Sequence, residues 1–324
     1  MNTPSVSVVI PLYNKERHIA RAIQSVLSQN GSDFELLVVN DGSTDGSAEV
    51  LKSFTDPRIR LVHREHVNSG GGHAARNLGI AESRADLIAF LDADDEWMPE
   101  HLGTLERLAE EYPACGIYAS AYVTLEPGGK LSAPVFVGIP AYPWEGVIPN
   151  YFRSAASYPV WTSAVAVPRR VLDSVGLFPF GVPRGGDVDM WSRIAIRYPI
   201  CYSTRVGAVY HKEADNRVCV LNQVLKEHCF IRDIQDAVRT GVIPSEQRRD
   251  ALEFVAYCQI GVADTNVMTG NPRYARLLLR SCRNSRKHAF AWWRLMLLAM
   301  LPPGWPARLQ AVKRAVWNLA GHRT

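Results

Sequence analysis

Short apolar, β-branched runs alternate with helical patterns through the first 112 residues. The apolar runs cover residues 6–10, 35–40, 58–63 and 87–91, and the helical patterns cover 16–29, 45–54, 72–83 and 99–112. Strands that take turns with helices form right-handed βαβ units. The first two runs are almost continuously apolar, as is typical of strands buried on both faces. The sequence predicts an α/β fold: a Rossmann-like, mostly parallel sheet with helices on both faces.

Polar side chains gather where three of these predicted strands end. They are Pro11, Tyr13 and Asn14 after the first strand, Asn40, Asp41 and Gly42 after the second, and Asp92, Asp94 and Asp95 after the fourth. Ligands bind at the carboxyl edge of open α/β sheets. Each group by itself also fits a turn or a helix cap. Because three strand ends meet at one edge, we expect a binding site there.

The segment 92–95 carries three carboxylates within four positions, directly after a buried strand. Carboxylates this close repel one another unless a cation lies among them, and hard divalent ions prefer oxygen ligands. The spacing Asp92, Asp94 therefore predicts a metal site. Two aspartates separated by one residue also occur by chance in many proteins. The prediction therefore depends on their position directly after a buried strand.

A glycine-rich stretch, NSGGGHAARNLG at 68–79, opens the third predicted helix. Glycines there let a ligand approach the backbone N–H groups at the positive end of the helix, which favours phosphate. His73, Arg76 and Asn77 fall on one helical face. The stretch follows the third strand and lacks the dinucleotide-binding spacing. The alternative is a flexible loop with a solvated Arg76.

Four motifs together resemble the family 2 glycosyltransferases of the GT-A fold: VVIPLYN at 8–14, VVNDGSTD at 38–45, AARNLG at 74–79 and LDADD at 91–95. The resemblance covers residues 5 to about 215. It implies an inverting transferase that uses a nucleotide-sugar, usually a UDP-sugar, with Mn²⁺ or Mg²⁺.

The resemblance also implies roles for individual residues. Pro11, Tyr13 and Glu16 would line the nucleotide pocket, and Asp41 would hydrogen-bond the uracil. Arg76 would contact the nucleotide, Asp92 the ribose or sugar, and Asp94 the metal.

The next segment, 116–185, is rich in proline, glycine and aromatic residues. Aromatic faces suit sugar rings, but packing under long loops has the same pattern. Trp161 opens 161–169, which we interpret as a strand under the acceptor cleft, and it is the aromatic residue we expect to contact substrate.

The sequence PRGGDVDMWSR at 183–193 resembles the family's helix that supplies the general base. On that register Asp187 is the base and Asp189 supports the helix start. Gly186 stands where the family often has Glu. The alternative is that Asp187 only caps the helix. The resemblance makes His211 a candidate near the metal or diphosphate, although a lone histidine is more often a packing or surface residue.

The C-terminal region differs in charge from the rest of the chain. Residues 271–324 contain eleven Lys or Arg and no Asp or Glu, whereas residues 1–270 contain 25 basic and 32 acidic residues. Helical patterns cover 217–240, 245–268, 273–287 and 306–319, and an apolar stretch covers 289–301. Basic helices interleaved with Trp and Leu predict peripheral membrane contact. A helical subdomain or an oligomer interface is the alternative, and no nucleic-acid-reading motif is present.

These features together predict the organisation and the activity. We expect a GT-A catalytic domain over 1–215, with a nucleotide-sugar half at 1–112 and an acceptor half at 113–215, and a helical, basic region over 216–324. With no secretory signal, no CxxC pair and no apolar stretch of about 20 residues, we expect a cytoplasmic protein at the inner face of the cell membrane.

The predicted activity is metal-dependent inverting transfer of a sugar to a hydroxyl of a saccharide or lipid-linked saccharide, in cell-surface polysaccharide or glycolipid assembly. The alternatives are a non-catalytic sugar-nucleotide or saccharide-binding module and a sugar-nucleotidyltransferase. The latter is expected to have a glycine-rich, basic signature near the first strand, which PLYN at 11–14 lacks.

Overall fold

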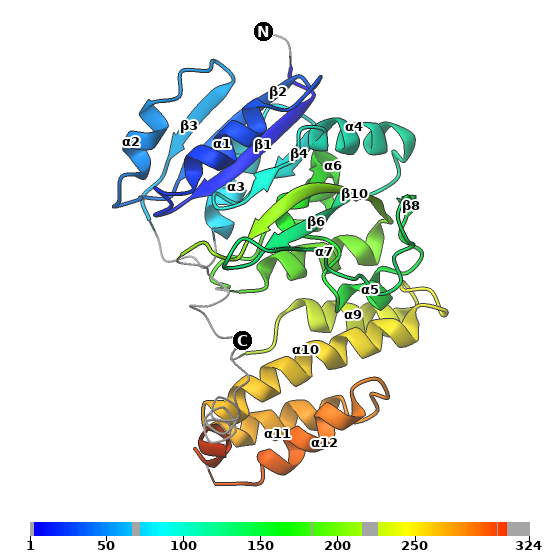
Figure 1. The fold of residues 1–324 in the computed structure, drawn as a ribbon. Helices are drawn as coiled ribbons and strands as arrows, with labels where there is room; N and C mark the ends of the chain where they lie inside the picture. Colours follow the sequence, from blue (N-terminus) through cyan, green and yellow to red (C-terminus); the bar gives the residue numbers. More distant parts are fainter. Residues whose placement is uncertain (1–2, 67–71, 183, 216–225, 303, 310–324) are drawn as a thin grey trace. The chain divides into compact units, whose positions relative to one another are not determined.

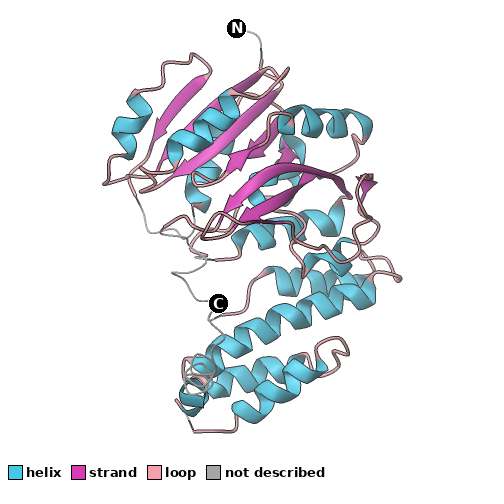
Figure 2. Ribbon diagram, in the orientation of Figure 1, coloured by secondary structure: helices cyan, strands magenta, loops and turns pink. Residues whose placement is uncertain are grey.

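The computed structural model describes residues 3–66, 72–182, 184–215, 226–302 and 304–309. The chain divides into two units, Met1–Asn222 and Gln223–Thr324. We call the first the α/β unit and the second the helical unit, and each is considered by itself (Figures 1 and 2).

One mixed sheet forms the centre of the α/β unit. Its main path runs β3-β2-β1-β4-β9-β6-β10-β5, with β7 beside β6 and β8 beside β10. The strands are β1 (Val6–Leu12), β2 (Phe34–Asn40), β3 (Ile59–His63), β4 (Leu87–Phe90), β5 (Glu96–Trp97), β6 (Ile117–Leu125), β7 (Leu131–Ser132), β8 (Glu145–Val147), β9 (Val165–Pro168) and β10 (Ile200–His211). The β1–β2, β1–β4, β2–β3 and β6–β10 pairs are parallel, and β9 is antiparallel to both β4 and β6.

The helices of this unit are α1 (Ile19–Leu27), α2 (Ser47–Lys52), α3 (His73–Glu82), α4 (His101–Glu111), α5 (Tyr151–Ala155), α6 (Arg169–Val175) and α7 (Gly186–Arg197), with a 3₁₀ turn η1 at Thr162–Ala164. From β1 the chain adds β2 and then β3 toward one edge of the sheet, and it then crosses back to form β4 on the other side of β1. Because such crossovers are right-handed, α3 lies on the face opposite α1 and α2. The predicted mostly parallel α/β sheet with helices on both faces is confirmed.

The strands β1, β2 and β3 end at the same level, because Leu12 is paired with Asn40 and Asn40 with His63. The neighbouring β4 ends earlier, with Phe90 paired with Val9 of β1. The sheet order reverses between β1 and β4, so their carboxyl ends open on a crevice where ligands bind in such sheets. The strands β1, β2 and β4 are buried along nearly their whole length, as their apolar sequences predict.

The predicted strand at 161–169 is shorter than expected. Its first part is the η1 turn, and β9 begins only at Val165. Ser163 within this turn accepts a hydrogen bond from the N–H of Asp92 and donates one to the carboxylate of Asp95. These bonds to the end of β4 replace the ladder bonds that a longer strand would make.

The helical unit contains α9 (Phe230–Thr240), α10 (Arg248–Met268), α11 (Pro272–Ser281) and α12 (Ala289–Leu298) around a core of its own. Residues 217–225 of the predicted helix over 217–240 lie outside the described residues, and α9 begins at Phe230. The predicted helix over 273–287 ends at Ser281. Beyond it, the buried carboxylate of Glu253 accepts bonds from the Arg286 and Lys287 N–H groups, just before α12. Residues 310–319 of the last predicted helix lie outside the described residues.

No helix in the described ranges is long and apolar enough to cross a membrane.

Candidate active site

Asp41, directly after β2, is buried between two basic side chains. Arg64 Nη1 lies 2.6 Å from Asp41 Oδ1, and His66 Nδ1 lies 3.3 Å from Oδ2. Burial raises the pKa of Asp41, although both neighbours act to lower it. The His66 ring stacks on Tyr13, with centroids 4.2 Å apart. The structure therefore brings the predicted Tyr13 and Asp41 together through residues at the end of β3.

The loops after β1 and β2 hold each other by side-chain bonds. Asn14 has a left-handed backbone with φ 51°, and its Oδ1 accepts from the Thr44 N–H at 2.8 Å. Glu16 Oε2 accepts from the Gly46 N–H at 3.0 Å, and Asp45 Oδ2 accepts from the Glu16 N–H. The carboxylate of Glu16 is thus engaged at the start of α2, and its contact with a nucleotide stays a prediction.

Arg76 lies buried at the start of α3. Its guanidinium donates to Asp92 Oδ1 and, at 3.3 Å, to His73 Nδ1, and it lies 5.7 Å from the centre of the Phe178 ring. Gly72, the residue before the helix, has φ 74° and lies beside Pro11. The structure brings Pro11, Arg76 and Asp92 together, while residues 68–71 of the glycine-rich stretch lie outside the described ranges.

Each carboxylate of the 92–95 segment has partners from the protein. Asp92 is paired with Arg76, and Asp94 Oδ2 accepts from Lys15 Nζ at 2.8 Å. Asp95 is fully buried and accepts from Ser163 Oγ at 2.5 Å. Burial and the charges of its two neighbours raise the pKa of Asp95 well above its usual range. Mutual repulsion alone therefore does not require a metal here.

A divalent ion still fits this donor set when substrate oxygens complete it. Within the described part of the chain, no three His, Cys, Asp or Glu side chains form a group able to hold a metal ion by themselves. Mg²⁺ is commonly bound by one or two carboxylates together with substrate phosphates. Asp94, half-buried at the strand edge, is suited to that mode of binding.

His211, at the end of β10, is buried between two carboxylates. Its Nδ1 lies 2.5 Å from Glu213 Oε1, and its Nε2 lies 3.6 Å from Glu96 Oε2. Burial acts to lower the pKa of His211, but the neighbouring carboxylates of Glu96 and Glu213 raise it. Because only a neutral imidazole binds a metal, this environment opposes metal binding unless the carboxylates move. Its metal role stays a prediction.

Asp187 is the second residue of α7, and Gly185 occupies the cap position. Asp187 Oδ1 accepts from the Val188 N–H at 2.9 Å, and Thr162 Oγ1 lies 3.5 Å from its Oδ2. Asp189 instead accepts from Arg193 Nε at 2.7 Å. Asp189 therefore supports the helix and the loop before it, which Arg193 also contacts, while Asp187 lies beside the η1 turn.

Trp161 lies between the acidic segment and two tyrosines. Its Nε1 donates to Asp95 Oδ2 at 3.3 Å, and its ring lies 4.4 Å from Tyr210 and 5.5 Å from Tyr122. The side chain is half-buried. It thus packs in the unit's core cluster, and its contact with substrate stays a prediction.

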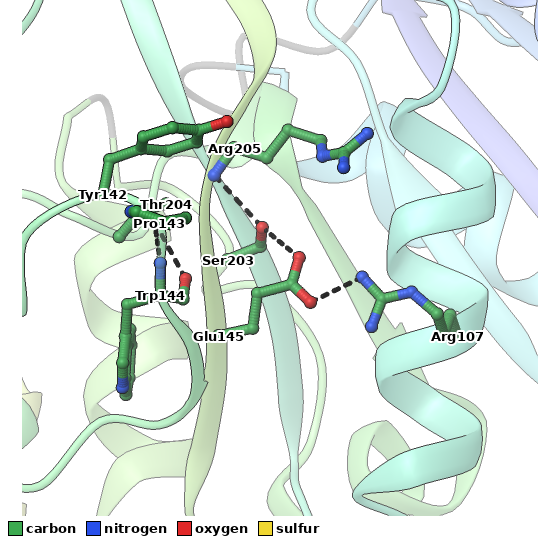
Figure 3. Close-up of a pocket in the computed structure, with 8 residues that line it drawn as sticks. All are labelled: Arg107, Tyr142, Pro143, Trp144, Glu145, Ser203, Thr204 and Arg205. Carbon is green, nitrogen blue, oxygen red and sulfur yellow. Dashed lines mark hydrogen bonds and ion pairs between the residues drawn. The ribbon is translucent and has the colours of Figure 1, made fainter.

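A separate hollow of about 460 Å³ opens beside β8 and β10 (Figure 3). Its lining includes Tyr142, Trp144 and Arg205 but none of the predicted site residues. Glu145 accepts here from Ser203 and Arg107; these bonds lower its pKa although burial acts to raise it. The hollow thus lies beside the hydrogen bonds that hold β8 against β10 and α4. Trp144 lines this hollow and not the predicted site.

Sequence reasoning missed Lys15, Arg64, His66 and Ser163. All four contact a predicted carboxylate from another strand end or turn. The only available signal was the sheet order: the end of β3 must lie next to the end of β2, which brings residues 64–66 to Asp41.

Comparison with known proteins finds a family match for residues 7–157. Residues 7–157 match the family described as Glycosyl transferase family 2. The chain carries a glycosyl transferase family 2 domain. The family 2 domain thus includes β1 to β6 and the whole 92–95 segment.

Three curated proteins similar to this chain come from bacteria. Glycosyltransferase GlyG of Streptococcus pneumoniae serotype 4 is 33% identical over 119 residues, which are 36% of this chain and 39% of GlyG. The uncharacterized glycosyltransferase YibD of Escherichia coli is 38% identical over 34% of this chain and 32% of YibD. An uncharacterized glycosyltransferase of Rickettsia felis is 32% identical over 62% of this chain and 32% of that protein. The chain matches less than half of the length of each relative.

Among solved structures, S. aureus TarS 1–349 in complex with UDP-GlcNAc matches 90% of this chain and 79% of its own, with TM-score 0.61 and 17% identity. At that identity the likeness concerns the fold, which is GT-A-like as expected.

Proposed function

We propose that this chain is an inverting glycosyltransferase that moves a sugar from a UDP-sugar to a hydroxyl of a saccharide or lipid-linked saccharide acceptor, in cell-surface polysaccharide or glycolipid assembly. The observation that carries the proposal is that Asp41 follows β2, Asp92 and Asp94 follow β4, and Arg76 at the start of α3 pairs with Asp92, all within the segment that matches family 2. The UDP-GlcNAc bound to TarS supports this donor class. The family match favours sugar transfer over sugar-nucleotidyl transfer.

The donor half would bind the nucleotide by stacking and by charge. Tyr13 offers an exposed aromatic face, and Asp41 offers an acceptor for the N–H of uracil. Pro11 and Glu16 would line the same pocket, and Arg76 would contact the phosphates while Asp92 meets the ribose or sugar. A bound Mn²⁺ or Mg²⁺ would stabilise the charge that develops on the departing diphosphate. Asp94 would hold that ion, with His211 as a second candidate ligand.

The acceptor half would supply the base. Inversion in a single displacement needs a group on the face opposite the leaving diphosphate, to take the proton of the attacking hydroxyl. Asp187 would do this from the start of α7, with Trp161 against the acceptor.

The Asp187→Asn variant tests the mechanism and Asp189→Asn is its matched control on the same helix. Asp187→Asn should leave UDP-sugar affinity unchanged and lower kcat by about 10² to 10⁴, the usual range for a lost general base. Asp189→Asn should lower stability through Arg193 with a much smaller effect on kcat. Retained transfer in Asp187→Asn contradicts the assignment, and binding without any product in the wild type would favour the non-catalytic binding module.

We further propose that the helical unit holds the enzyme at the inner face of the cell membrane. The exposed residues Phe290, Trp293, Leu297 and Met300 have 85%, 62%, 62% and 67% of their surface accessible. Their spacing of three and four residues places them on one face of α12 and its last turn. The opposite face, with Leu295 and Ala299, is buried. The exposed face of α12 is therefore also apolar, and an apolar environment such as a lipid interface would cover it.

Charge favours an anionic lipid surface as that phase. Arg280, Arg283, Arg286 and Lys287 are exposed next to α12, and the region 271–324 contains no acidic residue. A second copy would bring a second set of cations to the same face, whereas anionic headgroups attract them.

Co-sedimentation with phosphatidylglycerol vesicles tests this membrane proposal. The wild type should bind anionic vesicles and not phosphatidylcholine vesicles. Trp293→Ser with Leu297→Ser should bind at least tenfold more weakly, and Val242→Ser, an equally exposed apolar position in the same unit, should bind as the wild type. Absence of binding, or dimerisation that Trp293→Ser abolishes, contradicts the proposal.

A further inference from the structure

His73, the first residue of α3, is a buried histidine that the proposed chemistry does not use. Only 4% of its surface is exposed. Its Nδ1 lies 3.3 Å from Arg76 Nη1. A guanidinium can only donate, so Nδ1 accepts this bond and the ring proton lies on Nε2.

The imidazole also occupies the space of a missing side chain. A Cβ built on Gly186 would lie within 2.8 Å of two ring carbons of His73 and closer still to Nε2. The neighbour of Gly186 is Asp187, the proposed base. On its other side the ring stacks on Phe178, with centroids 5.7 Å apart. One side chain of α3 thus contacts both the donor-binding arginine and the start of α7.

Stability alone does not explain a histidine at this position. Nε2 is buried and has no hydrogen-bond partner among the residues that the structure describes. A buried N–H without an acceptor lowers the free energy of unfolding. A phenyl ring would avoid that loss, although it is larger than an imidazole. What a phenyl ring would lack is the acceptor for Arg76.

We propose that His73 is a positioning residue for the transfer reaction: its imidazole orients Arg76 toward Asp92 and, against the bare backbone of Gly186, fixes the start of α7 that carries Asp187. The inference rests on the proposed function and deepens it, because the contact with His73 explains why a glycine stands at position 186 beside the proposed base. Burial, followed by the charge of Arg76, lowers the pKa of His73 to about 3. The ring therefore stays neutral and able to accept throughout the pH range in which enzymes are assayed.

Two substitutions at position 73 separate the acceptor from the ring. His73→Phe keeps the ring and removes the acceptor, whereas His73→Asn keeps an acceptor at the position of Nδ1 and removes the ring. His73→Phe should bind UDP about tenfold more weakly, the affinity equivalent of one hydrogen bond to a charged group. His73→Asn should bind UDP within about threefold of the wild type. Undiminished UDP binding by His73→Phe overturns the role toward Arg76.

A second pair of variants tests the contact with Gly186. Gly186→Ala places a methyl group against the imidazole, so it should displace the start of α7 and lower kcat about tenfold with a smaller change in KM for the donor. The double variant His73→Asn with Gly186→Ala should recover most of that kcat, because the methyl group then has room. If the double variant is as slow as Gly186→Ala, the ring contact does not position the base.

The outcomes distinguish this inference from the proposed function. A wild type that binds no UDP and transfers no sugar overturns both. A wild type that transfers sugar, with a His73→Phe variant equal to it in UDP affinity, overturns only the role of His73.

Discussion

The buried carboxylate of Glu35 provides a test of how the donor half of the sheet is held together. Glu35, in β2, has 2% of its surface exposed, and its two oxygens accept four hydrogen bonds. Oε1 accepts from Ser7 Oγ and from the Arg84 N–H, each at 2.6 Å. Oε2 accepts from Arg84 Nε at 2.8 Å and from Arg60 Nη1 at 2.9 Å. This carboxylate thus joins β1, β2, β3 and the turn before β4.

Glu35→Gln converts one acceptor oxygen into a donor. If the NH₂ group replaces Oε2, the bonds from Arg84 Nε and Arg60 Nη1 both become contacts between donors. If it replaces Oε1, the Arg84 N–H faces a donor, whereas the Ser7 hydroxyl can turn and accept. Each bond to a buried charged acceptor contributes about 1.5 to 3 kcal/mol. The two arginines are partly exposed, and water compensates part of their loss. We expect a loss of about 3 kcal/mol at pH 7, which for a unit of this size lowers Tm by roughly 6 to 12 °C.

The loss should depend on pH. Burial acts to raise the pKa of Glu35, but the bonds from Ser7, Arg84 and Arg60 lower it. A carboxyl whose pKa is lower in the folded than in the unfolded chain stabilises the fold above the unfolded value, about 4.3, and this stabilisation is lost as pH falls through the folded value. The difference between wild type and Glu35→Gln should therefore shrink steadily below about pH 4.

Urea unfolding followed by circular dichroism at pH 7 and at several values below pH 4 measures this difference. Glu82→Gln is the matched control, because Glu82 also pairs with Arg60 but is exposed, and it should change the free energy of unfolding by less than about 0.5 kcal/mol. A Glu35→Gln variant as stable as the wild type at pH 7, or a difference that does not change with pH, refutes the reasoning.

Three further predictions concern the site and its support. EDTA should abolish transfer and Mn²⁺ restore it; product formation that persists in EDTA contradicts a metal role for Asp94. Lys15→Met removes the ammonium that competes for Asp94 and should tighten Mn²⁺ binding, measured calorimetrically with UDP, by about tenfold; weaker binding would instead assign Lys15 to the diphosphate. Gly79→Ala places a Cβ 3.1 Å from Val9 Cγ2 and closer still to Cγ1, so it should lower the free energy of unfolding by about 1 to 2 kcal/mol in urea unfolding; a gain from helix propensity would contradict this packing.

The first half of the fold could be predicted because each element is marked locally. Apolar runs of strand length and helical patterns follow one another up to residue 112, and β1 to β4 form where those runs occur. The second half carries weaker local marks. The strands β6, β9 and β10 pair with one another across long stretches of sequence, so their positions depend on tertiary pairing that no short segment specifies.

The helical unit shows the same limit at one residue. The pattern of 273–287 continues past Ser281, but α11 ends there, and Glu253 of α10 accepts bonds from the N–H groups of Arg286 and Lys287 in the segment before α12. Periodicity shows which face of a helix is apolar, and it gives no information about a side chain from a distant part of the sequence that holds the segment between two helices.

The sequence by itself determined the class of fold, the edge of the sheet where the proposed site lies, and the residues placed there, because buried parallel strands and the polar residues that follow them occupy consecutive positions in the sequence. Only the tertiary structure decided the partners of those residues. Asp41 lies against Arg64 and His66, Asp94 against Lys15, and Gly186 against His73. Such contacts depend on which strand ends are neighbours and on distances of a few ångströms, and these follow from packing in three dimensions.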